Sequence, residues 1–325
     1  MCYSAMVLQG LKKYQLRFKA RIDISILEDY YHRSLKGDVG LQFRAPKAFE
    51  ANFAAPETAA DRKILDFINA STEKRVREEQ QELFSYKKRL ADAERKLTEK
   101  VTKTAEKEKA VCERQIEKIK ARIERLQAKE LVESDSRIYS KNFAPLIVGG
   151  DNGERVIQLQ RYLMRPDGQP PEFDSKYPGC YNARLDNLDG FPWKFSFGKH
   201  HGILIVQKFY ENVQRHDYEK RKLKMDEKLE NMVLCFEPRG MEYIIIPCLY
   251  DIWHDEQGKE VLRSFALITD EPNPEVAAAG HNRTPIFLKE SAIDDWIFPQ
   301  GKSKEELYLI LKQREHPYYE HSVAA

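Results

Sequence analysis

The feature that most constrains the fold is a long segment without proline or glycine. Pro56 is followed by no proline until Pro145 and by no glycine until Gly149. The segment consists largely of Glu, Lys, Arg, Ala and Leu, which have high helix propensity. Its apolar residues form narrow seams typical of coiled coils, namely Val76, Leu83, Leu90 and Leu97 every seven residues, then Ile116, Ile119, Ile123 and Leu126 at 3,4,3 spacing.

Residues 57–133 are therefore predicted to form an inserted helical coiled coil, for which two arrangements are open. The seams are out of phase around TEKVTKTAEKEK, where Thr102 and Thr104 weaken helix propensity. An antiparallel hairpin bending there would join the two seams and return the chain near its starting point, and we favour it. The alternative is one continuous rod that pairs with another subunit. Acidic residues match the basic ones, so partner docking, self-association or a solvated spacer fits this segment better than DNA contact.

The flanks, residues 1–56 and 134–325, have a different pattern. Short β-branched and aromatic runs lie between turns and predict strands at RFKARIDISI, ERVIQLQRYL, HGILIVQKFY, EYIIIPCLYDIW and RSFALIT. Helical patterns occur at LEDYYHRSL, KESAIDDWI and KSKEELYLILKQ, the last with Ser303 at its expected N-cap. The two flanks are predicted to form one discontinuous α+β domain with a substantial mixed or antiparallel β core.

Composition excludes several classes of protein. The net charge of +2 argues against a histone-like polycation but allows a local basic surface that binds a few phosphates. No apolar run reaches the roughly 18–20 residues of a membrane span, and the N-terminus lacks the pattern of a secretory signal. The five cysteines form no CxxC pair, which argues against a disulfide framework or structural zinc. We expect a cytoplasmic protein, nucleoid-associated or nuclear if eukaryotic, with no cofactor and no metal.

Cys2 is the first residue that suggests chemistry, because it directly follows Met1. Removal of Met1 would leave an amine and a thiol on adjacent carbons, with ordinary pKa values of about 7.7–8.0 and about 8.5. Such a 1,2-aminothiol condenses with an aldehyde to an imine and then closes a thiazolidine ring. Small residues are common at the second position, so the dipeptide alone is also compatible with an ordinary N-terminus.

Three further segments carry candidate polar groups. CYNARLDNL places Asn182 and Arg184 on one face if it is extended, although a turn Asn and a solvated Arg would give the same letters. The apolar run ILIVQKFYENVQ ends in Glu211, whose burial would suit it to proton transfer, unless the chain simply re-enters solvent there. His281 follows a predicted strand and loop, where a histidine can shuttle protons or do nothing of the kind.

Together, the order and spacing of these segments resemble the SOS-response-associated peptidase (SRAP) family of abasic-site processing proteins. ANFAAPE, residues 51–57, is a second candidate for the family's N-x-A-P element, but KNFAPL is preferred because a strand follows it. The matching elements are Met1-Cys2, Asn142-Phe143-Ala144-Pro145, Asn182-Ala183-Arg184, Phe209-Tyr210-Glu211 and His281-Asn282-Arg283-Thr284-Pro285.

The resemblance implies a self-processing, peptidase-like protein with crosslinking or lyase-type activity on DNA. After loss of Met1, Cys2 would covalently trap the ring-opened aldehyde of an abasic site in single-stranded DNA. The remaining roles follow the same resemblance: Asn182 would orient the sugar or the amine, Glu211 would handle protons, His281 would act on the sugar ring oxygen, and Arg184, Arg283 and Asn142 would contact DNA.

The chain also departs from the family pattern. Tyr3 and Ser4 replace a glycine and an arginine, Asn212 replaces a tryptophan, and Thr284 replaces a methionine. A tryptophan–glycine segment is replaced by RYLMRPDGQPPEF, which removes an aromatic that would stack on an unpaired base. The aromatic residues available to substitute for it are Tyr162, Phe173 and Tyr177.

These departures leave two other hypotheses. One is an interaction protein with a degenerate SRAP-like core, whose coiled coil recruits a partner. The other, weaker one is a cysteine peptidase that acts on other proteins.

Overall fold

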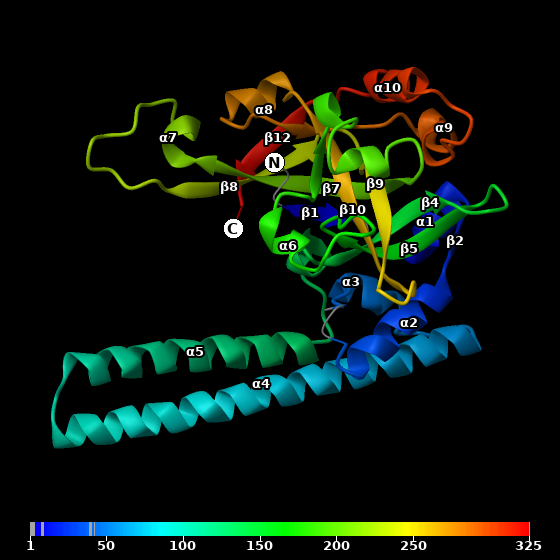
Figure 1. Ribbon diagram of the computed structural model, residues 1–325. Coiled ribbons are helices and arrows are strands. Elements are labelled where there is room, and N and C mark those ends of the chain that lie inside the picture. The colour runs from blue at the N-terminus through cyan, green and yellow to red at the C-terminus, as the bar shows by residue number, and fades with distance from the viewer. Residues whose placement is uncertain (1–3, 8–9, 39–40, 42, 325) are drawn as a thin grey trace. The chain divides into compact units, whose positions relative to one another are not determined.

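The computed structural model describes residues 4–7, 10–38, 41 and 43–324. The chain divides into two compact units. The β unit comprises residues 1–30, 39–52 and 132–325, and the helical unit comprises residues 31–38 and 53–131. Strands concentrate in the first unit and long helices in the second, which confirms the predicted α+β class (Figure 1).

The β unit is organised around five strands whose pairings close on themselves. β5 pairs with β4, β4 with β7, β7 with β9, β9 with β10, and β10 returns to β5. Only the β10–β5 contact in this circuit is parallel. The strands are β1 (Ser4–Val7), β2 (Ala20–Ile22), β3 (Arg137–Tyr139), β4 (Phe143–Gly149), β5 (Arg155–Tyr162), β6 (Asn182–Arg184), β7 (His201–Gln214), β8 (Asn231–Pro238), β9 (Ile244–His254), β10 (Glu260–Asp270), β11 (Thr284–Pro285) and β12 (Tyr319–Val323).

β7 is the spine of this unit because it pairs with four other strands. Its first half pairs with β9 and β4, and its second half pairs with β1 and β8. The run from Ile203 to Val206 is fully buried, as expected for a strand covered on both faces. At Gly202 a Cβ atom would lie 2.7 Å from the Leu146 side chain and 3.1 Å from the Ile147 carbonyl oxygen, so a larger residue would displace Leu146. The Trp296 indole covers this point and donates a hydrogen bond to the Gly202 carbonyl at 2.9 Å.

Short helices surround the sheet, and one predicted strand is largely helical. Of RFKARIDISI, only Ala20–Ile22 is a strand, and α1 and α2 take the residues on either side. The prediction was wrong there because Leu11, Tyr14 and Phe18 bury one face of a helix. The helices outside the coiled coil are α1 (Leu11–Phe18), α2 (Ile24–Leu35), α3 (Lys47–Glu50), α6 (Phe173–Lys176), α7 (Arg215–Tyr218), α8 (Pro274–Ala278), α9 (Ile293–Ile297) and α10 (Lys304–Lys312).

The helical unit is built on α4 (Ala59–Glu99) and α5 (Lys103–Gln127). Each helix begins at a threonine whose hydroxyl accepts a backbone N–H, Thr58 for α4 and Thr102 for α5. Two ion pairs join the helices, Arg89–Glu108 at 2.7 Å and Arg122–Glu79 at 2.8 Å. Arg89 comes after Glu79 in α4, whereas its partner Glu108 comes before Arg122 in α5. The two helices are therefore antiparallel.

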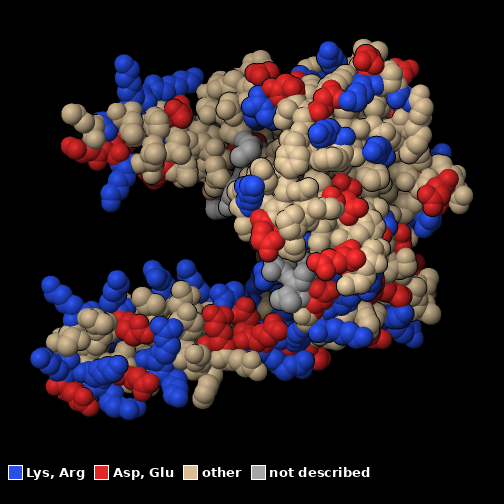
Figure 2. Space-filling model, viewed as in Figure 1, with Lys and Arg blue, Asp and Glu red and all other residues tan. Residues whose placement is uncertain are grey.

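The seam between α4 and α5 contains the predicted apolar residues. Val76, Ile116 and Ile119 are buried, whereas Leu83 and Leu90 are half-buried. Outside the seam, positive and negative side chains are interspersed over both helices (Figure 2). No helix in the described ranges is long and apolar enough to cross a membrane.

Candidate functional site

Glu211 and His281 form the centre of the candidate site. Glu211 lies on β7 opposite Leu234 of β8, and its side chain is fully buried. His281 follows α8, where its backbone N–H binds the Val276 carbonyl at 3.2 Å. The imidazole Nε2 lies 3.3 Å from the Glu211 Oε2, and only 8% of the His281 side chain is exposed. The strand therefore presents its carboxylate to the loop histidine, and Glu211 does not re-enter solvent.

The protonation of His281 determines how these two side chains interact. Burial lowers the pKa of His281 to about 3, so the imidazole is neutral at physiological pH. Its Nδ1 lies 2.9 Å from the Arg283 carbonyl oxygen and 3.3 Å from the Arg283 backbone nitrogen. If Nδ1 accepts from that N–H, Nε2 donates to the Glu211 carboxylate. If Nδ1 donates to the carbonyl, Nε2 carries no proton and can only accept a hydrogen bond. In either tautomer the pair can accept or release a proton in a water-poor environment.

Asn182 is held by neighbouring strands and by a buried tyrosine. It begins β6, which runs parallel to β10 with Asn182 opposite Leu267. The side chain is 5% exposed, and its Oδ1 accepts a hydrogen bond from the Tyr162 hydroxyl at 3.4 Å. Tyr162 itself is fully buried at the end of β5. The amide is therefore fixed in orientation and is not a solvent-facing turn residue.

Two arginines, Arg184 and Arg283, contact the carboxylate of Asp186. Arg184 is exposed and makes a bidentate ion pair with Asp186, with N···O distances of 2.9 and 2.6 Å. The Arg283 Nη2 reaches the same carboxylate at 3.9 Å, although 93% of its side chain is buried. Its Nη1 is buried and has no hydrogen-bond partner among the residues that the structure describes. This Arg184–Asp186–Arg283 cluster thus has surplus positive charge and an unused donor, which suit an anion.

The remaining predicted site residues lie elsewhere or outside the described ranges. Asn142 stands at the start of β4, and its Oδ1 accepts the Tyr139 backbone N–H at 2.9 Å, so this side chain closes a turn. Its carbonyl accepts the Tyr162 N–H at 2.7 Å, which connects it to the tyrosine that binds Asn182. Met1 and Cys2 lie outside the described residues.

Asn52, in the second N-x-A-P candidate, also has a structural contact. Its Oδ1 accepts the Leu11 N–H at the start of α1, at 3.0 Å. Its amide Nδ2 donates to the carbonyls of Ala48 and Phe49, at 3.3 and 2.7 Å. This side chain therefore joins the first helix of the β unit to the turn after α3.

The structure places a guanidinium beside Ser4, which the sequence reasoning did not foresee. Ser4 is fully buried in β1, where it lies between Tyr139 of β3 and Tyr210 of β7. The Arg137 Nε donates to the Ser4 Oγ at 2.9 Å, and its guanidinium carbon lies 3.6 Å from the centre of the Tyr210 ring. The arginine that the family pattern has at position 4 is absent, but β3 supplies a cation next to that position. Register across three strands, which no local pattern encodes, creates this arrangement.

The three aromatic residues expected to replace the missing tryptophan are buried or half-buried. Tyr162 and Phe173 are buried, which excludes them as platforms for a base, and Tyr177 is half-buried against Phe173. Two exposed rings lie further along the chain, Phe191 and Phe195, each 43% exposed and 6.1 Å apart between ring centres. The signal available in the sequence was the aromatic segment FPWKF after the N-A-R element.

Comparison with known protein families gives a match over most of the chain. Residues 103–324 match the family described as SOS response associated peptidase (SRAP). The chain belongs to the SRAP family. The SRAP match includes Asn182, Glu211 and His281 but not the first 102 residues, among them Cys2. Within the described part of the chain, no group of three or more His, Cys, Asp or Glu is placed to hold a metal ion.

Similar individual proteins are distant in sequence. The abasic site processing protein HMCES of Gallus gallus is 22% identical over 174 residues, 49% of this chain. The chain spans about half, 51%, of that relative's length. A solved protein from Bacteroides thetaiotaomicron is 17% identical over 58% of this chain and 77% of its own, with a TM-score of 0.46. Another from Bordetella bronchiseptica is 18% identical over 61% and 90%, with a TM-score of 0.45.

Proposed function

We propose that this SRAP protein captures abasic sites in single-stranded DNA through a thiazolidine formed by Cys2 after Met1 is removed. The buried contact between Glu211 and His281 carries the proposal, because it supplies a proton-transferring pair inside the region that matches the family. The name of the Gallus gallus relative points to the same substrate.

The proposed reaction needs an amine, a thiol and proton transfer, and no oxidant. Hydrolysis of the Met1–Cys2 peptide bond frees the amine. The Cys2 nitrogen attacks the aldehyde carbon of the ring-opened sugar, and the carbonyl oxygen leaves as water to give an imine. The Cys2 sulfur then adds to the imine carbon while the nitrogen takes the proton, which closes the ring. The net change is the loss of one water for each adduct.

Glu211 and His281 are proposed to move the protons of these steps. Glu211 accepts a proton from the attacking amine, and His281 carries one to and from the sugar oxygen. Ser4, the first described residue, pairs with Tyr210, the neighbour of Glu211. Cys2 is two residues from Ser4, and two residues span at most about 7 Å.

Recognition of the DNA is proposed to rest on an arginine cluster and on exposed aromatic rings. The Arg184–Asp186–Arg283 cluster offers donors to a phosphate next to the abasic nucleotide, with Asp186 as a competing anion. Phe191 and Phe195 offer exposed rings on which a neighbouring base can stack. Lys194, whose ammonium lies 5.3 Å from the Phe195 ring centre, adds positive charge at the same place.

An adduct assay with single-stranded DNA tests the proposed function. We expect a protein–DNA species that survives denaturation when the DNA contains an abasic site and is absent when it does not. Cys2→Ala should abolish it, whereas Cys112→Ala in the buried seam of α5 is a matched control that should retain it. Loss of the adduct in both variants, or in neither, contradicts a specific role for Cys2.

A further inference from the structure

The hairpin between β7 and β8 extends beyond the sheet as an arm, residues 215–230 (Figure 1). The arm begins four residues after Glu211 and contains α7. It carries six Lys or Arg residues and five Asp or Glu residues, an unusually charged loop for this unit. The positive charges of the arm fall into two groups, because its arginines pair with glutamates and its lysines face the solvent.

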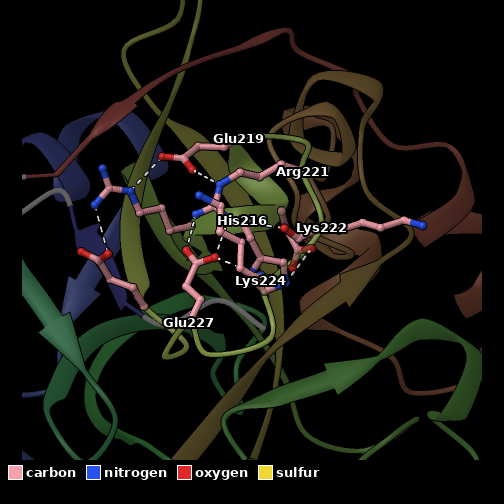
Figure 3. A network of polar contacts seen from close by, with 9 residues as sticks. His216, Glu219, Arg221, Lys222, Lys224 and Glu227 are labelled. Atoms are coloured by element: carbon pink, nitrogen blue, oxygen red, sulfur yellow. Dashed lines mark hydrogen bonds and ion pairs between the residues drawn. The ribbon is translucent and has the colours of Figure 1, made fainter.

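The two arginines of the arm hold its shape. Arg221 lies between Glu219 and Glu227 and makes a bidentate contact with Glu227 (Figure 3). This contact lowers the pKa of Glu227 to about 2, so the carboxylate stays charged at every physiological pH. Arg215 bridges Glu219 at 2.8 Å and Glu230 at 3.0 Å. Three of the five acidic residues are thereby neutralised by arginine within the arm.

The lysines of the arm are left to the solvent. Lys220, Lys222, Lys224 and Lys228 are exposed, and none makes an ion pair with the residues covered by the structure. Figure 3 shows the Lys222 side chain extending away from the Arg–Glu network. Apolar side chains accompany them, with Met225 98% exposed and Leu229 66% exposed. The surface that the arm offers a partner is therefore cationic with apolar contacts, although its formal charges nearly cancel.

The base of the arm adjoins the loop that carries His281. A Cβ atom on Gly280, the preceding residue, would lie 2.9 Å from the Val213 side chain and 3.2 Å from the Asp217 backbone. Gly280 also has a φ of +91°, which favours glycine. β7 thus carries Glu211 toward the site and continues directly into the lysine-bearing arm.

We propose that this arm is a second contact for single-stranded DNA, an inference that rests on the proposed function. Its lysine ammonium groups neutralise phosphates of the strand that leads away from the abasic nucleotide, while Met225 and Leu229 contact sugars and bases. Lysine suits this task because a long, flexible cationic side chain follows a backbone without reading sequence. The Arg–Glu network neutralises three of the five carboxylates of the arm, so that they oppose the DNA less.

Salt-dependent binding tests the arm separately from the covalent chemistry. The probe is fluorescently labelled single-stranded DNA without an abasic site, whose fluorescence anisotropy reports binding without adduct formation. In the triple variant Lys222→Gln, Lys224→Gln, Lys228→Gln, the slope of log affinity against log salt should fall by about 2, since each lost phosphate contact on a single strand removes about 0.7. The control removes three equivalent exposed charges from the helical unit, Lys87→Gln, Lys107→Gln and Lys118→Gln, and should leave the slope unchanged.

Adduct formation with saturating abasic DNA distinguishes the two proposals. The arm variant should reach the wild-type adduct yield there, because its reacting groups are intact. An unchanged slope and affinity in the arm variant overturns the inference even if the wild type forms adducts, and points to a partner other than DNA for the arm. If the wild type forms no adduct but the arm variant still shows the predicted loss of slope, the proposed chemistry is overturned and the arm remains a DNA contact. A wild type that does not bind the probe overturns the inference outright.

Discussion

Replacing Glu211 by glutamine should stop the chemistry without unfolding the protein. The amide keeps the size of the buried side chain but cannot accept a proton. With the pKa of His281 at about 3, only about one molecule in 10⁴ has a charged imidazole at pH 7, so the histidine cannot replace the carboxylate as the charged partner. Loss of a general base costs about 10²–10⁴ in rate, which corresponds to about 3–5 kcal/mol of barrier height.

The assay must separate removal of Met1 from capture of the aldehyde, because failure of the first step would conceal the second. A fusion cleaved directly before Cys2 supplies the free amine to wild type and Glu211→Gln alike, and the rate of adduct formation is then measured with protein in excess over abasic DNA. Intact mass of the unfused proteins reports Met1 removal. Glu237→Gln, on the adjacent strand β8 with an exposed side chain, is the matched control.

A rate for Glu211→Gln within about twofold of the wild type, in the fused form, would refute a proton-transfer role, since a working base contributes at least about a hundredfold. The pH dependence gives a second check. The wild-type rate should rise toward pH 8 with the ionisation of the amine and thiol, whose ordinary pKa values are about 7.7–8.0 and 8.5. It should show no inflection near pH 6.5, because His281 stays neutral throughout that range.

Other predictions concern recognition and stability. Asp186→Asn removes the carboxylate that pairs with Arg184, so the affinity for single-stranded DNA should rise by up to about fivefold. This change is equivalent to about 1 kcal/mol, the upper value for an exposed ion pair. An unchanged affinity in anisotropy titrations would argue against Arg184 as a phosphate contact. Phe191→Ala should weaken the same binding by about 1–3 kcal/mol, whereas Phe84→Ala on α4, also exposed, should not. Burial lowers the pKa of His201 to about 3, so the unfolded state binds an extra proton at this residue below pH 6.5. His201 should therefore make stability fall by about 1.4 kcal/mol per pH unit as the pH drops from about 6.5 toward 3, in addition to the contribution of His281. In urea titrations the slope of His201→Gln should be smaller than that of the wild type by this amount.

Local patterns were sufficient for the α+β class and for the longest elements. The runs HGILIVQKFY and RSFALIT lie in β7 and β10 because each is apolar enough to be buried on both faces. The heptad seam likewise indicates a helix pair, since charged residues surround it on every other face. Around Ala20 the same reasoning failed, because short amphipathic helices and strands have similar composition when only a few residues are considered.

The contacts of the candidate site could not be read from the sequence. Glu211 and His281 are 70 positions apart, and the pairing of β7 with its neighbours brings them together. The burial of Tyr162 and Phe173 and the exposure of Phe191 depend on the same packing, which aromatic character alone does not reveal. The Arg137–Ser4 contact requires the register of β1 against β3, which the sequence does not specify locally.

Burial divides the proposed machinery into two parts that mutation can separate. The buried part consists of Glu211, His281 and Asn182, which are shielded from water. A fixed carboxylate or amide in such a place acts strongly on a reacting group. It cannot attract DNA from a distance. Arg184 and the arm lysines are exposed, where charge speeds association and is screened by salt. Variants of the buried group should therefore change the adduct rate at saturating DNA, and variants of the exposed group should change only the concentration needed to saturate. A lysine variant of the arm that lowered the saturating rate would show that the arm also positions the abasic nucleotide, and the division would fail at that point.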